Sequence, residues 1–140
     1  MKENYKILGK FIKDMSSETS DIETFLFVKD YISKYQLNID ITSKALKNKM
    51  VEINTTLKFE DKNENSKKSH FEIIFATIVR INDKIKEKKD LQKIILCDVQ
   101  KEIYPDLEKS FLDLLHNSGY PEIKFEKKID FEKLYNQRFN

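Results

Sequence analysis

The sequence has few of the residues that form cross-links and tight ligand-binding loops. Its 140 residues include two glycines, two prolines, one cysteine and no tryptophan. A single cysteine excludes an internal disulfide and fits a reducing compartment. Two isolated glycines exclude the glycine-rich loop that brings backbone amides close to a nucleotide phosphate. No secretory signal and no membrane-spanning run is visible. We therefore expect a cytoplasmic protein with no cofactor.

Arginine is also scarce, because the 26 basic residues comprise 24 lysines and only Arg80 and Arg138. Recognition of phosphates and bases relies strongly on the guanidinium group, so this balance argues only weakly for nucleic acid. A composition of 39% hydrophobic and 36% charged residues, with a net charge of +2, is typical of a folded chain with a solvated surface. The length predicts a single domain over residues 1–140.

No group of residues has the spacing of a catalytic or metal site. His70 and His116 stand apart from each other and from the only cysteine, Cys97, which lies in an apolar run. Ser110, Asp113 and His116 are the residue types of a hydrolase triad. At three-residue steps along one helix, however, they are stacked side by side, and the histidine does not point back at the serine. We expect no enzymatic activity, no catalytic residue and no metal.

Alternation of apolar and polar residues indicates β-strands in the first half of the chain. Gly9 lies within the first of these strands and predicts a bulge or a close backbone approach. The last strand carries apolar residues on both faces, so its second face requires a partner. Polar segments at 43–49 and 61–68 have the length of hairpin connections. The predicted strands are 5–15, 35–41, 51–59 and 70–81.

The second half of the chain changes to a helical period. Apolar residues recur at helical spacing over 91–103 and again after Pro105, which either starts a second helix or kinks a long one. Gly119 suits the left-handed residue that follows a helix, and Asp130 suits the N-cap of a final helix. Strands followed by helices predict an α+β domain with the helices gathered on one side of an antiparallel sheet.

Aromatic residues are plentiful, with ten phenylalanines and six tyrosines. The final helix alone carries Phe131, Tyr135 and Phe139, more large apolar area than a short surface helix needs. These rings close the core over the sheet, or they border a groove that binds extended apolar peptides. Periodicity leaves both alternatives open.

Several ordered patterns resemble the SecB family of protein-export chaperones. FIKDMSSETS, at residues 11–20, is similar to the family segment that ends its first strand, and VKDYISKYQLNIDIT, at 28–42, is similar to the segment that leads into its second. The resemblance covers roughly residues 5–139, and its most specific part lies in the C-terminal half, where the family motifs occur in the same order. Its members are Cys97, Tyr104-Pro105, Gly119-Tyr120-Pro121, Ile129-Asp130-Phe131 and Leu134-Tyr135.

The resemblance implies a four-stranded antiparallel sheet with two main helices packed on one side. It also implies a homotetramer, arranged as a dimer of dimers, that holds unfolded preproteins in surface grooves without ATP and delivers them to SecA. The family residues implicated in SecA contact match Asp14, Glu18 and Glu72. Other positions match residues that line the client groove (Tyr31 and Phe131, with Tyr135 as an addition) or that form oligomer interfaces (Phe71, Ile73 and Phe75).

Two other interpretations of the sequence compete with an export chaperone. The first is a SecB-like chaperone dedicated to another client, such as the antitoxin of a toxin–antitoxin pair. The second is a small α+β domain that binds nucleic acid by stacking bases on an aromatic sheet face. The latter requires arginines and glycines beside the aromatic residues on adjacent strands, and the chain offers no glycine there and no arginine other than Arg80.

Overall fold

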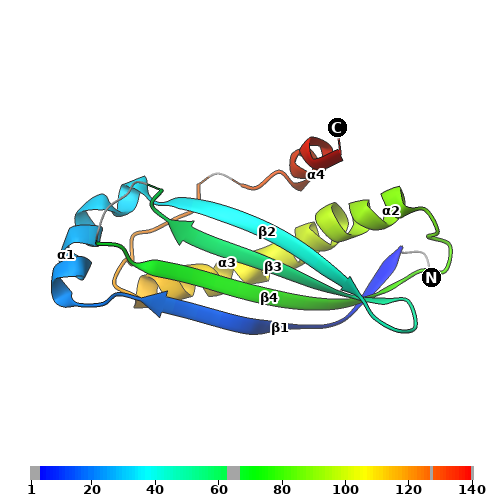
Figure 1. The fold of residues 1–140 in the computed structure, drawn as a ribbon, viewed down its shortest axis with the longest axis horizontal. Coiled ribbons are helices and arrows are strands. Elements are labelled where there is room, and N and C mark those ends of the chain that lie inside the picture. Colours follow the sequence, from blue (N-terminus) through cyan, green and yellow to red (C-terminus); the bar gives the residue numbers. More distant parts are fainter. Residues whose placement is uncertain (1–3, 63–66, 127, 140) are drawn as a thin grey trace.

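The fold is built on one four-stranded antiparallel sheet. The computed structural model describes residues 4–62, 67–126 and 128–139. The strand order is β1-β4-β3-β2, so that β1 and β2 form the two edges (Figure 1). The strands are β1 (Tyr5–Glu18), β2 (Gln36–Ala45), β3 (Met50–Glu60) and β4 (His70–Ile81). The predicted four-stranded sheet with helices on one side is confirmed.

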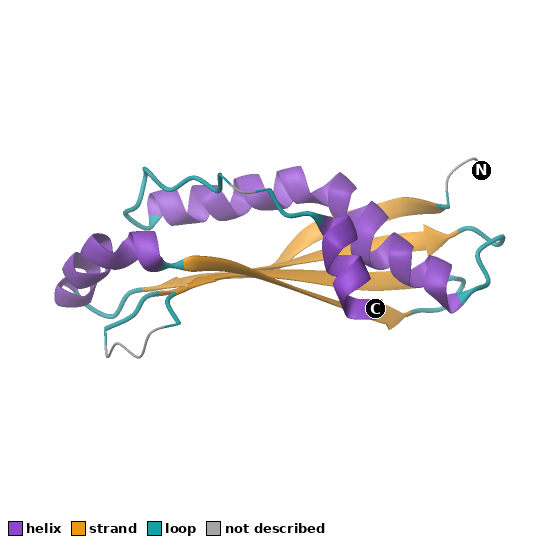
Figure 2. Cartoon of the chain, turned by 90° about the horizontal axis from the view of Figure 1, so that it is seen from above, coloured by secondary structure: helices purple, strands orange, loops and turns teal. Residues whose placement is uncertain are grey.

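The helices cover one face of this sheet and leave the other face open (Figure 2). A long helical segment runs from α2 (Lys88–Lys93) through a five-residue π-helical stretch (Ile94–Asp98) into α3 (Val99–Asn117). The chain then returns through a connector, residues 120–126 and 128–130 of the described chain, which has no helix or strand, to α4 (Phe131–Phe139). A further helix, α1 (Ile22–Tyr31), and a 3₁₀ turn (Ile32–Lys34) link the two edge strands at one end of the sheet.

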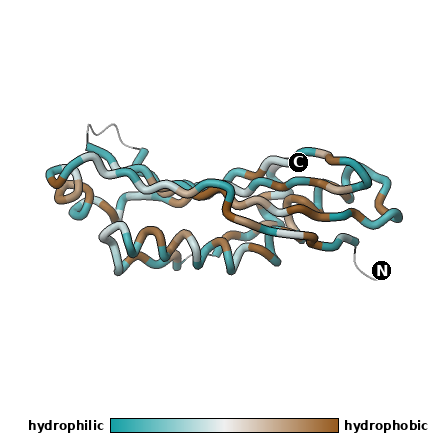
Figure 3. Tube along the Cα trace, turned by 90° about the horizontal axis from the view of Figure 1, so that it is seen from below, coloured by the Kyte–Doolittle hydropathy of each residue, from teal (hydrophilic) through white to brown (hydrophobic). Residues whose placement is uncertain are grey.

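Alternation along the strands decides which face is buried. Odd-numbered residues of β3 and β4 point toward the helices, and Ile53, Leu57 and Ile73 have no exposed surface. Val99, Ile103, Leu107 and Phe111, spaced by four residues, give α3 a fully buried stripe against them. Apolar residues accordingly alternate with polar ones along the strands in Figure 3. One continuous core therefore lies between the sheet and the helical segment.

Two local features differ from the sequence predictions, and a third decides between two predicted alternatives. The helix α1 was not predicted, although Asp21 caps it by accepting a 2.7 Å hydrogen bond from the backbone N–H of Thr24. Residues 43–45 belong to β2 rather than to a connection, because the turn needs only 46–49, where Asn48 and Lys49 both have positive φ. Pro105 lies inside α3, so of the two predicted alternatives, a new helix or one long helix, the structure shows the long helix. Part of the predicted 61–68 connection lies outside the described residues.

Other predicted details are confirmed. The pairing of β1 with β4 shifts register between Ile7 and Gly9, where a bulge was expected, and again between Ile12 and Asp14. Asp130 caps α4 by accepting a 3.0 Å hydrogen bond from the backbone N–H of Lys133. Gly119 follows α3 with φ of 110°.

The π-helical stretch is tied to the sheet by a buried glutamine. The Thr55 hydroxyl on β3 donates to Oε1 of Gln100 at 2.9 Å, and Nε2 of Gln100 donates to the carbonyl of Ile95 at 3.1 Å. Both side chains are fully buried. Because an unpaired polar group would be costly there, this link fixes how the long helical segment sits on the central strands.

Gly119 ends α3 in a Schellman motif and sets the direction of the connector. The N–H of Tyr120 donates to the carbonyl of Leu115, and the N–H of Gly119 donates to that of His116, both at 3.2 Å. Tyr120 is then buried against Phe71, with ring centroids 5.8 Å apart. From this point the connector crosses the helical side of the sheet toward α4 (Figure 2).

Candidate functional site

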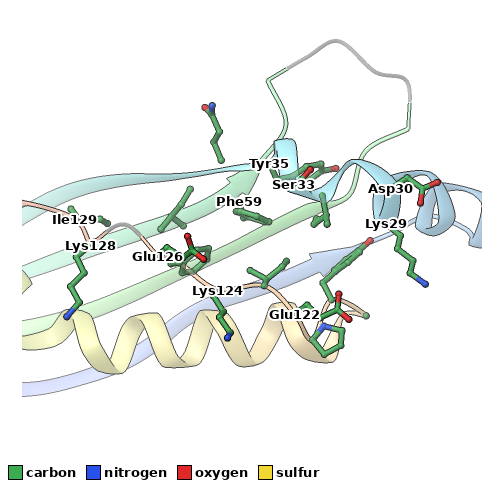
Figure 4. A pocket seen from close by; sticks show the side chains of 18 residues that line it. Lys29, Asp30, Ser33, Tyr35, Phe59, Glu122, Lys124, Glu126, Lys128 and Ile129 are labelled. Carbon is green, nitrogen blue, oxygen red and sulfur yellow. The ribbon is translucent and has the colours of Figure 1, made fainter.

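A large cavity lies between the connector and the start of β2, and we call it the connector groove. Its volume is about 1060 Å³ and it is open to solvent. The end of α1, the 3₁₀ turn and the first residues of β2 form one wall, and residues 119–126, 128 and 129 form the other (Figure 4). The apolar lining residues that matter below are Ile32, Leu37, Phe59, Tyr120, Ile123 and Phe125.

A cluster of aromatic rings forms the floor of the connector groove. Phe125 of the connector packs between Phe59, with centroids 5.7 Å apart, and Phe111 of α3, at 6.2 Å. Phe59 also contacts Tyr35, at 5.5 Å. Phe125 is only partly buried, so an apolar surface remains available to a bound chain. Such a floor favours aliphatic and aromatic side chains without fixing their identity.

Hydrogen bonds tie Tyr35, a lining residue of the connector groove, to neighbouring segments of the chain. The Tyr35 hydroxyl accepts a 3.1 Å hydrogen bond from the backbone N–H of Ser69, and the Ser69 and Thr19 hydroxyls are 2.7 Å apart. Burial raises the pKa of Tyr35 and that of Tyr120 above the usual value, so both phenols stay neutral over the physiological range. These contacts join segments before α1, after it and before β4.

The rim of the connector groove carries mixed charge. Three lysines and three carboxylates alternate around it and are all exposed: Lys29, Asp30, Glu122, Lys124, Glu126 and Lys128. In Figure 4 the labelled side chains Lys124 and Lys128 extend from the connector on the side opposite β2. Because the charges balance, the rim selects no strongly acidic or basic ligand.

Side-chain packing holds most of the connector in place. His116 Nε2 lies 2.9 Å from the carbonyl oxygen of Ile123, and the Ile123 N–H donates to the carbonyl of Tyr120 at 3.3 Å. Among the described residues, no backbone hydrogen bond joins 124–126 or 128–129 to the rest of the chain. Ile123, Phe125 and Ile129 instead pack on the core. The connector therefore forms a wall whose polar backbone is open to a ligand.

The described part of the chain contains neither a candidate metal site nor a candidate membrane-spanning helix. No group of three or more histidine, cysteine or carboxylate residues is placed to hold a metal ion within it. None of the helices there is both long enough and apolar enough to span a membrane.

The comparison with protein families gives the groove a context. The family model described as preprotein translocase subunit SecB matches residues 1–140. The chain belongs to the SecB family. It is 63% identical over its whole length to a putative protein-export protein SecB of Pelagibacter ubique, all of which is covered. It is 21% identical over 131 residues to the protein-export protein SecB of Rhodopseudomonas palustris, covering 94% of this chain and 78% of that one.

A solved structure supports the fold at much lower identity. The chain is similar to a Mycobacterium tuberculosis SecB-like chaperone in complex with a peptide from an antitoxin. The TM-score is 0.62 at 12% identity, and the match covers 89% of this chain and 91% of that one. This likeness shows the SecB-like fold. SecB family proteins are export chaperones and not enzymes. Membership of the family therefore confirms two predictions from the sequence, the resemblance to export chaperones and the lack of enzymatic activity.

The three aromatic residues predicted to line a client groove do not meet in one place. Tyr31 lies beside the connector groove, between its lining residues Asp30 and Ile32, but its ring stacks on Phe27 at 4.6 Å. Phe131 is only 4% exposed and packs edge-on against Tyr104 at 5.4 Å. Phe131 is thus a core residue of this chain that anchors α4.

Tyr135 lies at a second, smaller cavity. This cavity, of about 120 Å³, is bounded by α4 and the middle of β2. It is lined by Ile39, Asp40, Ile41, Leu96, Leu134 and Tyr135.

The aromatic floor of the connector groove was not predicted from the sequence. The alternation of Ile123 and Phe125 directly after Gly119-Tyr120-Pro121 was the signal that could have revealed it.

The residues predicted to form oligomer interfaces lie in the core of the single subunit, and their role at an interface stays a prediction. Phe71, Ile73 and Phe75 are 2%, 0% and 5% exposed, because they point from β4 toward α3. They therefore have almost no surface left for a second subunit. The side chains of β4 that point to the open face include Ile74 and Ile78, which are partly buried.

The three carboxylates predicted to contact SecA share one end of the open face. Glu72 pairs with Ser16 across β4 and β1, and Glu18 pairs with His70. Phe71 and Ile73 point toward the helices, so Glu72 between them points to the open face. Asp14 and Glu18 lie two residues on either side of its partner Ser16 on β1, and they point to the same face. Asp14 and Glu18 are exposed, and Glu72 is partly buried.

Proposed function

We propose that this SecB family protein holds unfolded preproteins without ATP and delivers them to SecA. The observation that carries the proposal is the connector groove, an open cavity of about 1060 Å³ with an aromatic floor and a rim of balanced charge. Such a surface suits extended apolar segments of many sequences. Full-length identity of 63% to a putative protein-export protein favours an export role over a dedicated antitoxin chaperone.

Assembly into a homotetramer, as a dimer of dimers in the cytoplasm, is part of this proposal. Support comes from β1, an edge strand with four large apolar side chains that are 43–49% exposed. They are Leu8, Phe11, Ile12 and Met15. A long apolar edge invites pairing with another chain, so we place the first subunit contact along β1.

The test of the holding function is an aggregation assay without ATP, combined with a mass measurement in solution. A slow-folding preprotein diluted from denaturant should stay soluble when this protein is present at stoichiometric amounts, and the mass should be about four times 16.7 kDa. Light scattering and analytical ultracentrifugation measure the two quantities. A monomer that does not delay aggregation contradicts the proposal.

Delivery to SecA predicts a separate effect on the open face. Asp14→Lys combined with Glu72→Lys replaces two carboxylates with two positive charges. If SecA presents a basic surface here, the new lysines repel it, and the affinity for SecA should fall at least fivefold. Affinity for an unfolded preprotein should not change, because these residues lie on the face opposite the connector groove. Isothermal titration calorimetry measures both affinities.

The matched control is Asp40→Lys, an exposed charge reversal on the far edge strand of the same face. An equal loss of SecA affinity in this control would show a general charge effect. Unchanged affinity in the Asp14 and Glu72 variant would refute the assigned contact.

A further inference from the structure

The end of the sheet that carries the β2–β3 turn is more basic than the rest of the chain, and we call it the basic end. It comprises the turn, residues 46–49, and the segment 80–90, which leads from β4 into α2. All its charged side chains are exposed, seven basic and three acidic. The net charge of the whole chain is only +2, so the remaining residues are net negative. The basic residues are Lys47, Lys49, Arg80, Lys84, Lys86, Lys88 and Lys89.

Backbone and side-chain contacts bring the two parts of the basic end together. The N–H of Ile81 donates to the carbonyl of Lys49 at 2.9 Å, and Nζ of Lys49 lies 3.5 Å from Oδ1 of Asp83. Within 46–49 and 80–90, all of which the structure describes, this is the one ion pair, so most of the positive charge is not neutralised locally. In Figure 1 both parts lie at the end of the sheet where the N-terminus is marked.

The opposite end of the sheet, where α1 lies, has no such excess of positive charge. Across α1 and the 3₁₀ turn, Glu23 and Asp30 balance Lys29 and Lys34. Charge is therefore distributed unevenly along the strands. An uneven distribution of this kind orients a molecule in the field of a surface of opposite charge, with its basic end foremost.

The chemistry of the basic end fits an anionic lipid surface better than a nucleic acid. Six of its seven cations are lysines, which act as point charges and lack the planar fork that reads phosphates and bases. None of the large apolar side chains that the described chain exposes lies in 46–49 or 80–90, so no ring is available there to stack on a base. Both parts are connections beyond the ends of strands, so their lysines can meet a flat surface together.

We propose that the basic end binds electrostatically to a membrane surface rich in anionic phospholipid. Its lysines lie at the headgroup phosphates, and no part of the chain enters the hydrocarbon layer. Clusters of about four to eight basic residues are typical of segments that bind such surfaces. This inference goes beyond the proposed function, because it gives a partner to a surface that neither the connector groove nor the carboxylates assigned to SecA contact include.

Flotation with lipid vesicles tests this binding, with the full-length protein and no client. Vesicles of phosphatidylglycerol and phosphatidylcholine in equal parts should carry the protein up a density gradient at low salt, and vesicles of phosphatidylcholine alone should not. Because the contact is electrostatic, raising the salt from about 0.05 M to about 0.5 M should release the protein. No binding at low salt, or equal binding to both kinds of vesicle, would overturn the inference.

A triple variant, Lys47→Gln with Lys84→Gln and Lys86→Gln, locates the contact. The affinity for the anionic vesicles should fall roughly 100-fold, about fivefold for each lysine removed. The matched control removes three exposed lysines from the opposite end and changes the net charge equally, so its affinity should fall at most about threefold. The control substitutions are Lys34→Gln, Lys58→Gln and Lys62→Gln. Circular dichroism shows that both variants are folded.

Each other outcome has a distinct meaning. Equal losses in the two triple variants would show an effect of net charge alone and overturn the assigned surface. If polyuridylate binds more tightly than the vesicles at the same salt, and the basic-end variant loses that binding, the partner is a nucleic acid and the inference is overturned. Because no client is present, failure to bind vesicles leaves the holding function standing. Conversely, a protein that binds vesicles but does not delay aggregation contradicts only the proposed function.

Discussion

Gly119→Ala should lower the free energy of unfolding by about 2–5 kcal/mol. Gly119 has φ of 110°, a backbone conformation that residues with a Cβ rarely adopt. An added Cβ would also lie 2.4 Å from Cε1 of Phe25, far inside contact distance. The ring of Phe25 would have to move, which breaks its packing on Tyr120 at 5.6 Å. Chemical denaturation measures the change.

The chain offers a matched control in its only other glycine. A Cβ built on Gly9 meets nothing within 4 Å, and its φ is not in the left-handed region. Gly9→Ala should therefore change stability by less than about 1 kcal/mol. Similar losses in the two variants would contradict the special role of Gly119.

Phe25→Ala in the Gly119→Ala background separates the two causes of the loss. Phe25→Ala itself loses the packing on Tyr120, so the single variant is the reference. Measured against it, Gly119→Ala should cost less than in the native chain, because the clash is gone and only the backbone strain remains. If Gly119→Ala costs nothing in the Phe25→Ala background, the clash alone is responsible. The same variants should weaken client binding, because Gly119 directs the connector along the groove.

Ile123→Ser combined with Phe125→Ser should weaken the binding of an unfolded preprotein roughly 30- to 150-fold. Both side chains line the connector groove and are partly buried. Removing their apolar surface from a binding site loses about 2–3 kcal/mol, which corresponds to this change in affinity. Fluorescence anisotropy with a labelled, permanently unfolded preprotein measures the dissociation constant.

Tyr31→Ser is the control for this loss. It removes an aromatic ring that lies beside the connector groove and is 37% exposed, but does not line the cavity. We expect at most a threefold effect on affinity. If Tyr31→Ser is the more damaging change while both variants keep their circular dichroism spectra, the client contacts α1 rather than the connector.

Short-range patterns accounted for most of the secondary structure. Period-two alternation located β3 and β4 to within a residue, since each strand has one face against the core. The N-cap at Asp130 and the glycine after α3 were equally local, because caps depend on a few neighbouring atoms. By contrast, α1 was missed because it is apolar almost all round and shows no clear stripe.

The candidate site was harder to locate because its residues meet only through folding. Phe59, Phe111 and Phe125 come from a strand, a helix and a connector, and the sequence does not state that they meet. Likewise, the sequence placed aromatic residues in α4 without deciding which way they face. Packing against Tyr104 turned Phe131 into the core.

By itself the sequence determined the class of fold, the absence of a nucleotide loop and the resemblance to export chaperones. These follow from composition, from periods of two and 3.6 residues, and from ordered motifs along the chain. Only the tertiary structure decided that β1 and β2 are the edges, that the connector forms a groove wall, and that Phe71, Ile73 and Phe75 are inside. The reason is physical: strand order and burial depend on contacts between residues far apart in the chain, which no local pattern encodes.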